Sequence, residues 1–481
     1  MTGADPAPQV AGAAGAPGTA PAVPTRRGTE LVMLAFAVVI TLAAQCVVDI
    51  TVTGSLRPEL AAFGGWFTAL WAVMHVVVRR FAPYADPLLL PAVALLSGLG
   101  LTMIHRLDLA GEQVGATATR EDAPVQLVWA TLGVGLFVAV LLVIRDHRLL
   151  SRFAYTLALV GLLLLALPAV LPASISSVNG AKIWIRLAGF SIQPGEFAKI
   201  CLIVFFAAYL VDKRDVLALA SRRVMGLELP RGRDLGPVVV AWLLSILVLV
   251  FERDLGSSLL LFGIFVVMLY VATERASWLV IGVGLFGAGA FLAYQLFGHV
   301  QVRVDTWLDP FAYRDEGGYQ MVQSLLGLGT GGLFGAGLGG GRPDQVPVAK
   351  SDFIAAAIGE ELGLFGLVAV IIVYLVLVER GLRSSLIVRD AFGKLLAAGL
   401  AFAVAWQVFV VLGGVTGLLP LTGLTTPFVA YGGSSLVANF ALLAILVRIS
   451  DAARRPAAPP VQPGPPQRAM LGEAPTEVVR P

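Results

Sequence analysis

The sequence predicts an all-α, polytopic membrane protein, in which a bundle of helices crosses a membrane repeatedly and one large extracellular loop spans residues 299–353. Three observations predict this class. Hydrophobic residues make up 57% of the 481 residues, charged residues only 14%, and the mean hydropathy is +0.85, which is too much apolar surface for one soluble core. Apolar runs of spanning length recur along the chain, and basic residues favour alternate connecting segments.

Both ends of the chain have compositions that do not support a packed core. The first 24 residues are mostly Ala, Pro, Gly and Thr and lack the early basic residues of a secretory signal, and the N-terminal tail is predicted to extend over residues 1–28. Residues 454–481 are rich in proline. Because such segments bury too little apolar surface to fold, we expect two disordered cytoplasmic tails.

Between the tails, twelve apolar runs of spanning or near-spanning length predict twelve transmembrane helices. They lie at residues 31–49, 59–78, 88–104, 126–144, 150–171, 196–211, 236–251, 255–272, 277–297, 354–379, 391–413 and 427–449.

The basic residues of the connecting segments orient these helices. With the N-terminus inside, the inner segments hold about twice as many Lys and Arg residues as the outer ones, as the positive-inside rule requires. An even number of helices returns both tails to the cytoplasm. The loop 299–353 then lies on the side of the membrane opposite the cytoplasm. The net charge of +3 reflects the inner loops and does not indicate a nucleic-acid partner.

The loop 299–353 is the first candidate for a catalytic site. It is polar and rich in glycine, whereas the neighbouring segments carry almost no charge. Loops of this length inside a compact protein are usually functional or disordered. Its glycine series from Gly327 to Gly341 lacks the phosphate-loop pattern GxxxxGK[ST] and indicates a close-packed re-entrant or interfacial segment, with lipid phosphate binding through backbone N–H groups as the alternative.

Ionisable residues near or within the apolar runs predict a polar cavity, since charge in hydrocarbon is costly and tends to mark a site. On the predicted topology all of them belong to the outer half, beneath the 299–353 loop. Taken singly, Glu196 and Lys199 would only pair with each other. The residues expected in the cavity are Glu196, Asp254, Asp352, Glu360 and Glu361.

Five strings resemble the SEDS family, which comprises the FtsW, RodA and SpoVE proteins, and they occur in the family's order. They are VNGAKIWIRLAGFSIQPGEFAK (178–199), RDLGSS (253–258), DP followed by GGYQMVQS (309–324), KSDFIAAAIGEELG (350–363) and GLLPLTGLTTPFVAYGGSSLVANF (417–440). The resemblance implies a ten-helix core over residues 88–450. Residues 29–80 would then form two additional N-terminal helices.

The resemblance also implies an activity. Members of this family are peptidoglycan glycosyltransferases that polymerise lipid II, an undecaprenyl-diphosphate-linked disaccharide pentapeptide, into glycan strands for cell-wall elongation or division. They work with a class B penicillin-binding transpeptidase. The shared motifs do not separate elongation from division or sporulation.

The reaction needs a base, because a sugar hydroxyl is a poor nucleophile until a carboxylate within hydrogen-bond reach takes its proton. The family's catalytic aspartate typically follows the DP proline by three positions, where Tyr313 stands in this sequence. Asp315 lies two positions further on and is the expected base. Asp309 and Glu316 are the alternates, although Asp309 precedes a proline and is also an ordinary turn residue.

The leaving diphosphate needs cations aimed at its developing charge. Arg303 is the first candidate, because it precedes Pro310 by seven residues as in the family. The further candidates are Lys350, Arg342 and Lys199. A divalent cation, Mg²⁺ or Mn²⁺, would serve the same purpose, although two distant cysteines and four scattered histidines form no metal-ligand pattern.

Two other functions fit a polytopic bundle with buried carboxylates. A flippase or transporter of lipid-linked precursors would use residues such as Glu360 as an ion site, but the single large outer loop and the lack of an obvious internal repeat argue against it. A non-catalytic scaffold for the transpeptidase would leave the outer charges without a role.

Overall fold

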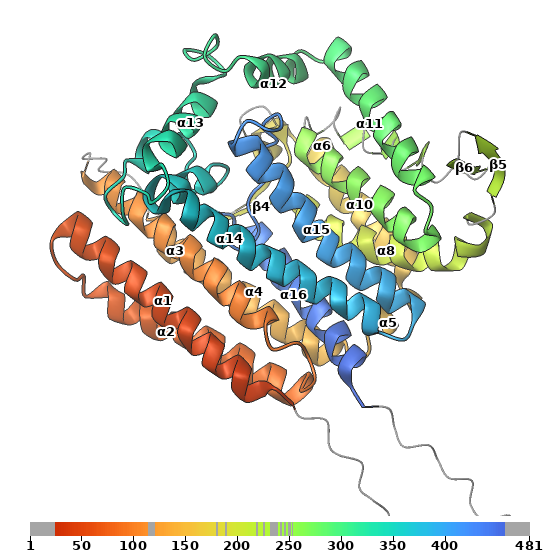
Figure 1. Cartoon of the computed structure of the whole chain (residues 1–481), viewed down its shortest axis with the longest axis horizontal. Helices are drawn as coiled ribbons and strands as arrows, with labels where there is room; N and C mark the ends of the chain where they lie inside the picture. Colours follow the sequence, from red (N-terminus) through yellow and green to blue (C-terminus); the bar gives the residue numbers. More distant parts are fainter. Residues whose placement is uncertain are drawn as a thin grey trace, which may run out of the picture. The chain divides into compact units, whose positions relative to one another are not determined.

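The computed structural model describes residues 25–113, 121–178, 181–187, 190–217, 220–224, 227–230 and 254–456, and a few scattered residues between 239 and 252. Residues Thr25–Arg454 form one compact unit, a bundle of long helices (Figure 1). Within the described residues, ten helices are long and apolar enough to cross a membrane. The predicted class of a polytopic helical bundle is therefore confirmed.

The first two helices, α1 (Arg27–Thr53) and α2 (Glu59–Phe81), form a hairpin beside α3 (Leu89–Gln113). Buried residues of α1 recur every three or four positions, at Leu34, Ala37 and Thr41, which is the stripe of a helix packed on one side. Thr41 faces Gly98 of α3, where an added Cβ would lie 1.9 Å from the threonine hydroxyl oxygen. Close contact between α1 and α3 therefore depends on this glycine.

Small elements connect the next spanning helices. The helix α4 (Asp122–Val143) is followed by the short α5 (Leu149–Arg152), by α6 (Ala154–Val170) and by α7 (Ala173–Ser176). Two short antiparallel hairpins come next, β1 (Ser177–Val178) with β2 (Ala181–Lys182) and β3 (Ile185–Leu187) with β4 (Phe190–Ile192). They lead into α8 (Pro194–Leu217), which begins with a proline at a position where the helix needs no N–H donor.

A third hairpin, β5 (Ala220–Val224) with β6 (Leu227–Pro230), follows α8. The helices α10 (Leu255–Thr273) and α11 (Ser277–Leu296) come next. Figure 1 shows α11 standing apart from the rest of the bundle, and most of its side chains are exposed. A cavity lined by residues of both helices, among them Phe262 and Phe286, lies between α10 and α11.

The segment predicted as a polar loop contains two helices, α12 (Gly298–Leu308) and α13 (Tyr319–Gly331), and the 3₁₀ turn Pro343–Gln345. They lie over one end of the bundle (Figure 1). Both helices are short and only partly apolar, so the search for spanning runs does not detect them. They form because they bury apolar side chains against other segments, Val300 in α12 and Met321 and Val322 in α13.

The last three spanning helices are α14 (Ile354–Ile387), α15 (Ala391–Val415) and α16 (Gly433–Arg454). The helix α16 is buried along nearly its whole length, because it contacts α4, α8, α14 and α15. It is therefore the centre of the bundle.

A break in α14 holds the segment that we call the glycine loop, residues 332–342. Gly363 has a φ of +68° and interrupts the helix. Ala336 and Gly337 donate their backbone N–H groups to the carbonyls of the two residues Glu360 and Glu361, at 3.0 and 2.9 Å. An added Cβ at Gly335 would lie 2.2 Å from one of these carbonyl oxygens, so only glycine permits the contact. The close packing expected of the glycine series is present.

Eleven of the twelve predicted spans coincide with helices. The run at residues 150–171 corresponds to α6, which has 17 residues and is shorter than the ten spanning helices. The run at 236–251 lies largely outside the described residues.

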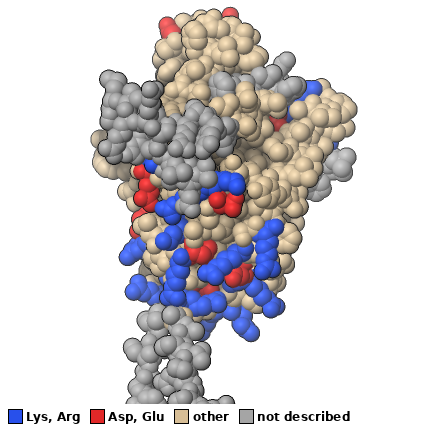
Figure 2. Space-filling view, turned by 90° about the vertical axis from the view of Figure 1, so that its right-hand side faces the viewer, with Lys and Arg blue, Asp and Glu red and all other residues tan. Residues whose placement is uncertain are grey.

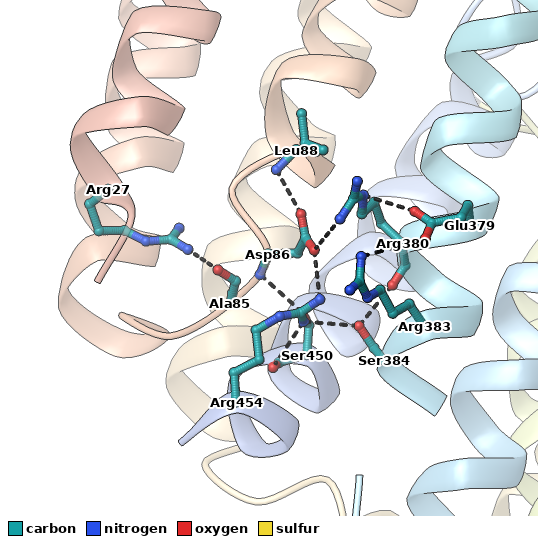
Figure 3. A network of polar contacts seen from close by, with 10 residues as sticks. All are labelled: Arg27, Ala85, Asp86, Leu88, Glu379, Arg380, Arg383, Ser384, Ser450 and Arg454. Carbon is teal, nitrogen blue, oxygen red and sulfur yellow. Dashed lines mark hydrogen bonds and ion pairs between the residues drawn. The ribbon is translucent and has the colours of Figure 1, made fainter. Parts of the chain in front are cut away.

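At the end of the bundle opposite α12 and α13, an ionic network joins three segments (Figure 3). The buried carboxylate of Asp86 accepts a hydrogen bond from Arg454 at 2.6 Å and lies 3.8 Å from Arg380. Its backbone N–H donates to the hydroxyl of Ser450 at 3.0 Å. On the face drawn in Figure 2, Lys and Arg side chains gather toward this end of the molecule.

Candidate functional site

The candidate site centres on Arg303 of α12. Its guanidinium donates to the backbone carbonyls of Leu421 and Thr422, both at 3.2 Å. One turn later, the indole N–H of Trp307 donates to the carbonyl of Gly417 at 2.9 Å. These bonds fix α12 on the connection between α15 and α16, since carbonyls that follow a helix otherwise lack partners.

Two carboxylates lie within electrostatic reach of Arg303. Asp254 is buried and caps α10, where it accepts the backbone N–H of Ser257 at 3.1 Å. Burial raises the pKa of Asp254, and Arg303 acts in the opposite direction. Burial also raises the pKa of Asp352. The charge of Arg303 lowers this pKa, and the charge of Asp254 raises it. The structure thus brings together three of the predicted residues, one cation and two carboxylates that resist ionisation.

These pKa shifts predict a pH dependence of stability. A carboxyl group whose pKa is higher in the folded than in the unfolded state stabilises the fold fully below the unfolded pKa, and this contribution is lost as the pH rises through the folded pKa. We expect Asp352→Asn to raise the thermal unfolding midpoint of the detergent-solubilised protein by a few degrees at pH 7 and to change it little at pH 4. An equal shift at both pH values would contradict the assignment. Asp309→Asn, on an exposed turn, is the matched control.

The expected base lies on the turn between α12 and α13. The Asp315 side chain is 91% exposed, and its carboxylate is 3.5 Å from the guanidinium of the preceding residue, Arg314. Asp309 accepts the backbone N–H of Ala312 at 3.1 Å, which makes it a turn residue. Glu316 is exposed. Among the described residues, none of these three carboxylates forms a hydrogen bond or an ion pair with Arg303.

Two cavities lie against α12 and share Trp307 in their walls. The smaller, of about 60 Å³, is lined by Arg303 and by Gly317, two residues after Asp315. The larger, of about 350 Å³, lies between α10, α11 and α12, and apolar residues such as Phe262, Phe286 and Val304 line it. An ionic site and an apolar cavity therefore adjoin the same helix.

Lys350, predicted to bind diphosphate, lies between two carboxylates. Its ammonium is 2.5 Å from Asp108 at the end of α3 and 2.8 Å from Asp122 at the start of α4. Burial lowers the pKa of Lys350, but these hydrogen bonds outweigh burial and raise it overall. The charge of Lys350 is thus already balanced within the protein.

Glu196 and Lys199 form the pair that their spacing suggested. The ammonium of Lys199 donates to Glu196 and to the amide oxygen of Gln407, both at 2.8 Å. All three side chains are buried. Gln407 in turn donates to the carbonyl of Thr425 at 2.9 Å, so the pair is fixed to α15 and to the segment before α16.

Glu360 and Glu361 bind the glycine loop. Glu360 accepts the backbone N–H of Arg342 at 2.7 Å. Glu361, which is fully buried, accepts the side chain of Arg106 at 2.8 Å. The Arg342 side chain itself is exposed, and nothing in its described contacts joins it to Arg303.

Sequence reasoning missed several partners of these residues. Arg106, Asp108 and Asp122 lie at ends of spanning helices, where charge is common. Gln407 is a single amide in an apolar helix, and that alone was a usable signal. Among the described residues, no group of three or more His, Cys, Asp or Glu side chains is arranged to hold a metal ion.

Comparisons with known proteins agree with the sequence motifs. Residues 87–455 match the family model described as FTSW_RODA_SPOVE, cell cycle protein. The peptidoglycan glycosyltransferase RodA of Mycobacterium tuberculosis is 54% identical over 459 residues, which cover 95% of this chain and 97% of that protein.

Two solved structures are similar over most of their length. A chain of a peptidoglycan synthase complex, solved to describe the coordination of polymerization and crosslinking, is 25% identical with a TM-score of 0.59 and covers 77% of this chain and 99% of that chain. The rod shape determining protein RodA of Thermus thermophilus is 25% identical with a TM-score of 0.52 and covers 77% of this chain and 98% of its own.

Proposed function

The chain belongs to the FtsW, RodA and SpoVE family and is a peptidoglycan glycosyltransferase, and from this premise we propose that it polymerises lipid II at the outer face of the plasma membrane. The observation that carries the proposal is the 54% identity to a RodA glycosyltransferase across 95% of the chain. The relatives at this level of identity carry the name RodA, which favours elongation of the cell wall.

Lipid II polymerisation requires three functions of the site. A base takes the proton of the attacking sugar hydroxyl, whose oxygen bonds to the anomeric carbon of the second substrate. The bond from that carbon to the diphosphate oxygen breaks, and the diphosphate leaves with the electron pair. The polyprenyl chains of both substrates stay in an apolar environment throughout.

Residues of the 299–353 loop and an adjoining apolar cavity supply these functions. Asp315 is the base, Arg303 stabilises the leaving diphosphate, and the apolar cavity of about 350 Å³ beside α12 takes part of a polyprenyl chain. The exposure of Asp315 means that substrate or a partner has to cover this turn during the reaction. A divalent cation bound with the diphosphate would add to the charge of Arg303.

The distribution of basic residues supports the orientation that we propose for the chain. The exposed basic residues Arg79, Arg148, Arg383 and Arg389 all lie at helix ends opposite the α12–α13 segment, the arrangement expected when that end is cytoplasmic. Both tails then lie in the cytoplasm and the loop 299–353 outside. The partner is a class B penicillin-binding protein, as the similarity to a synthase-complex chain suggests.

Purified protein with its partner transpeptidase, given labelled lipid II, tests the proposal. Glycan polymer is the expected product, measured by gel electrophoresis with and without Mg²⁺ or Mn²⁺. Movement of lipid II across liposomes without any polymer would instead identify a flippase. Polymer formed by the transpeptidase alone at the same rate would identify a scaffold.

A further inference from the structure

The outer end of α1 touches the glycine loop. Gly339 has a φ of +83°, and a Cβ placed there would lie 2.9 Å from the Cβ of Thr51 and 3.0 Å from a methyl carbon of Val52. The α1–α2 hairpin precedes the residues that match the family model, 87–455. A helix outside the matched core is therefore in van der Waals contact with the glycine loop.

A polar contact fixes α1 close to this point. The carboxylate of Asp49, two residues before Thr51, lies 2.8 Å from the Nε2 atom of His105 in α3. Asp49 is 1% exposed. The free-energy cost of burying its carboxylate is therefore offset mainly by this hydrogen bond. The spacing of Asp49 and Thr51 along α1 places the bond within one turn of the contact with Gly339.

The residue after His105 continues the connection to α14. Arg106 donates to Glu361 at 2.8 Å and to the carbonyl of Gly341 at 2.7 Å. The second oxygen of Glu361 accepts the backbone N–H of Gly339 at 3.0 Å. The tip of the glycine loop is thus held from three sides, by α1, α3 and α14.

The glycine loop in turn positions α13. The 13 residues of this helix, about 20 Å in length, connect the turn that carries Asp315 to the start of the glycine loop. Gly335 of the glycine loop donates its backbone N–H to the carbonyl of Gly331, the last residue of α13, at 2.8 Å. A shift of the loop would therefore displace α13 and the Asp315 turn with it.

We propose that the α1–α2 hairpin holds the glycine loop against α14 and thereby positions the Asp315 turn for glycosyl transfer, with Asp49 as a positioning residue. The inference rests on the function proposed above. It gives the two additional helices a role in the reaction that the core helices alone do not supply.

The test uses the full-length protein with its partner transpeptidase. Asp49→Ala is expected to lower the rate of polymerisation at saturating lipid II about tenfold, because small displacements of reacting groups are costly, and to leave KM within about twofold. Thr41→Ala, which lies on the same buried face of α1 but more than two turns away, is the control and keeps the full rate. An unchanged rate for Asp49→Ala overturns the proposal.

Asp49→Asn is the conservative variant. Its side-chain oxygen can still accept a hydrogen bond from the Nε2 atom of His105, so the rate is expected to stay within about twofold of that of the unsubstituted protein. A loss as large as that in Asp49→Ala contradicts positioning through this hydrogen bond.

A second measurement does not depend on catalysis. Labelling of Leu338→Cys by a membrane-impermeant maleimide is expected to be about fivefold faster in Asp49→Ala than in Thr41→Ala, because the loop is released. If the unsubstituted protein makes no polymer, the proposed function fails while this labelling still decides whether the hairpin holds the loop. Equal labelling rates overturn the proposal.

Discussion

Replacing Asp315 with alanine is expected to lower glycan polymerisation about 10²- to 10⁴-fold, the usual range for loss of a general base. The hydroxyl of the acceptor sugar would then have to attack with its proton in place. Because the Asp315 side chain is 91% exposed, its removal costs the fold little. The measurement is the rate of polymer formation from labelled lipid II, with thermal unfolding as the check that the protein is intact.

Two neighbouring carboxylates are the matched controls for Asp315. Asp309→Asn keeps a side-chain oxygen that can accept the Ala312 N–H, and Glu316→Gln removes one charge from the same turn. Both are expected to retain most of the rate. A normal rate in Asp315→Ala together with a large loss in either control would assign the base to that residue.

Much of the bundle was predictable because a bilayer imposes length and apolarity on every helix that crosses it. The structure has helices at eleven of the twelve predicted runs. The helices α12 and α13 were not predicted, since they are short and stabilised by packing on other segments. The break at Gly363 depends on hydrogen bonds from a loop about 25 residues earlier in the chain, which no local pattern encodes.

The site was only partly predictable for a related reason. Asp254 and Asp352 were predicted because they are ionisable residues near or within apolar runs, whereas Arg303 was predicted from its spacing to Pro310. Their proximity comes from the docking of α12 on the connection after α15. The two carboxylates that accept hydrogen bonds from Lys350 are 242 and 228 residues away in sequence. Lys350 could therefore be selected from the sequence, but its partners could not.

Arg303→Ala is expected to lower kcat/KM for lipid II about 10²- to 10³-fold, the loss typical of removing one group that stabilises developing negative charge. The same substitution removes the cation that lowers the pKa of Asp254 and of Asp352. An effect of the substitution on the stability of the fold therefore has to be separated from its effect on the leaving group. Arg303→Ala combined with Asp352→Asn removes one of the two carboxylates and is expected to regain unfolding temperature but not activity. If the double variant instead polymerises lipid II as fast as Asp352→Asn alone, Arg303 only balances the charge of these carboxylates. Arg303→Lys is expected to retain part of the rate, because an ammonium keeps the charge but cannot reproduce the paired donation to the carbonyls of the 421–422 segment.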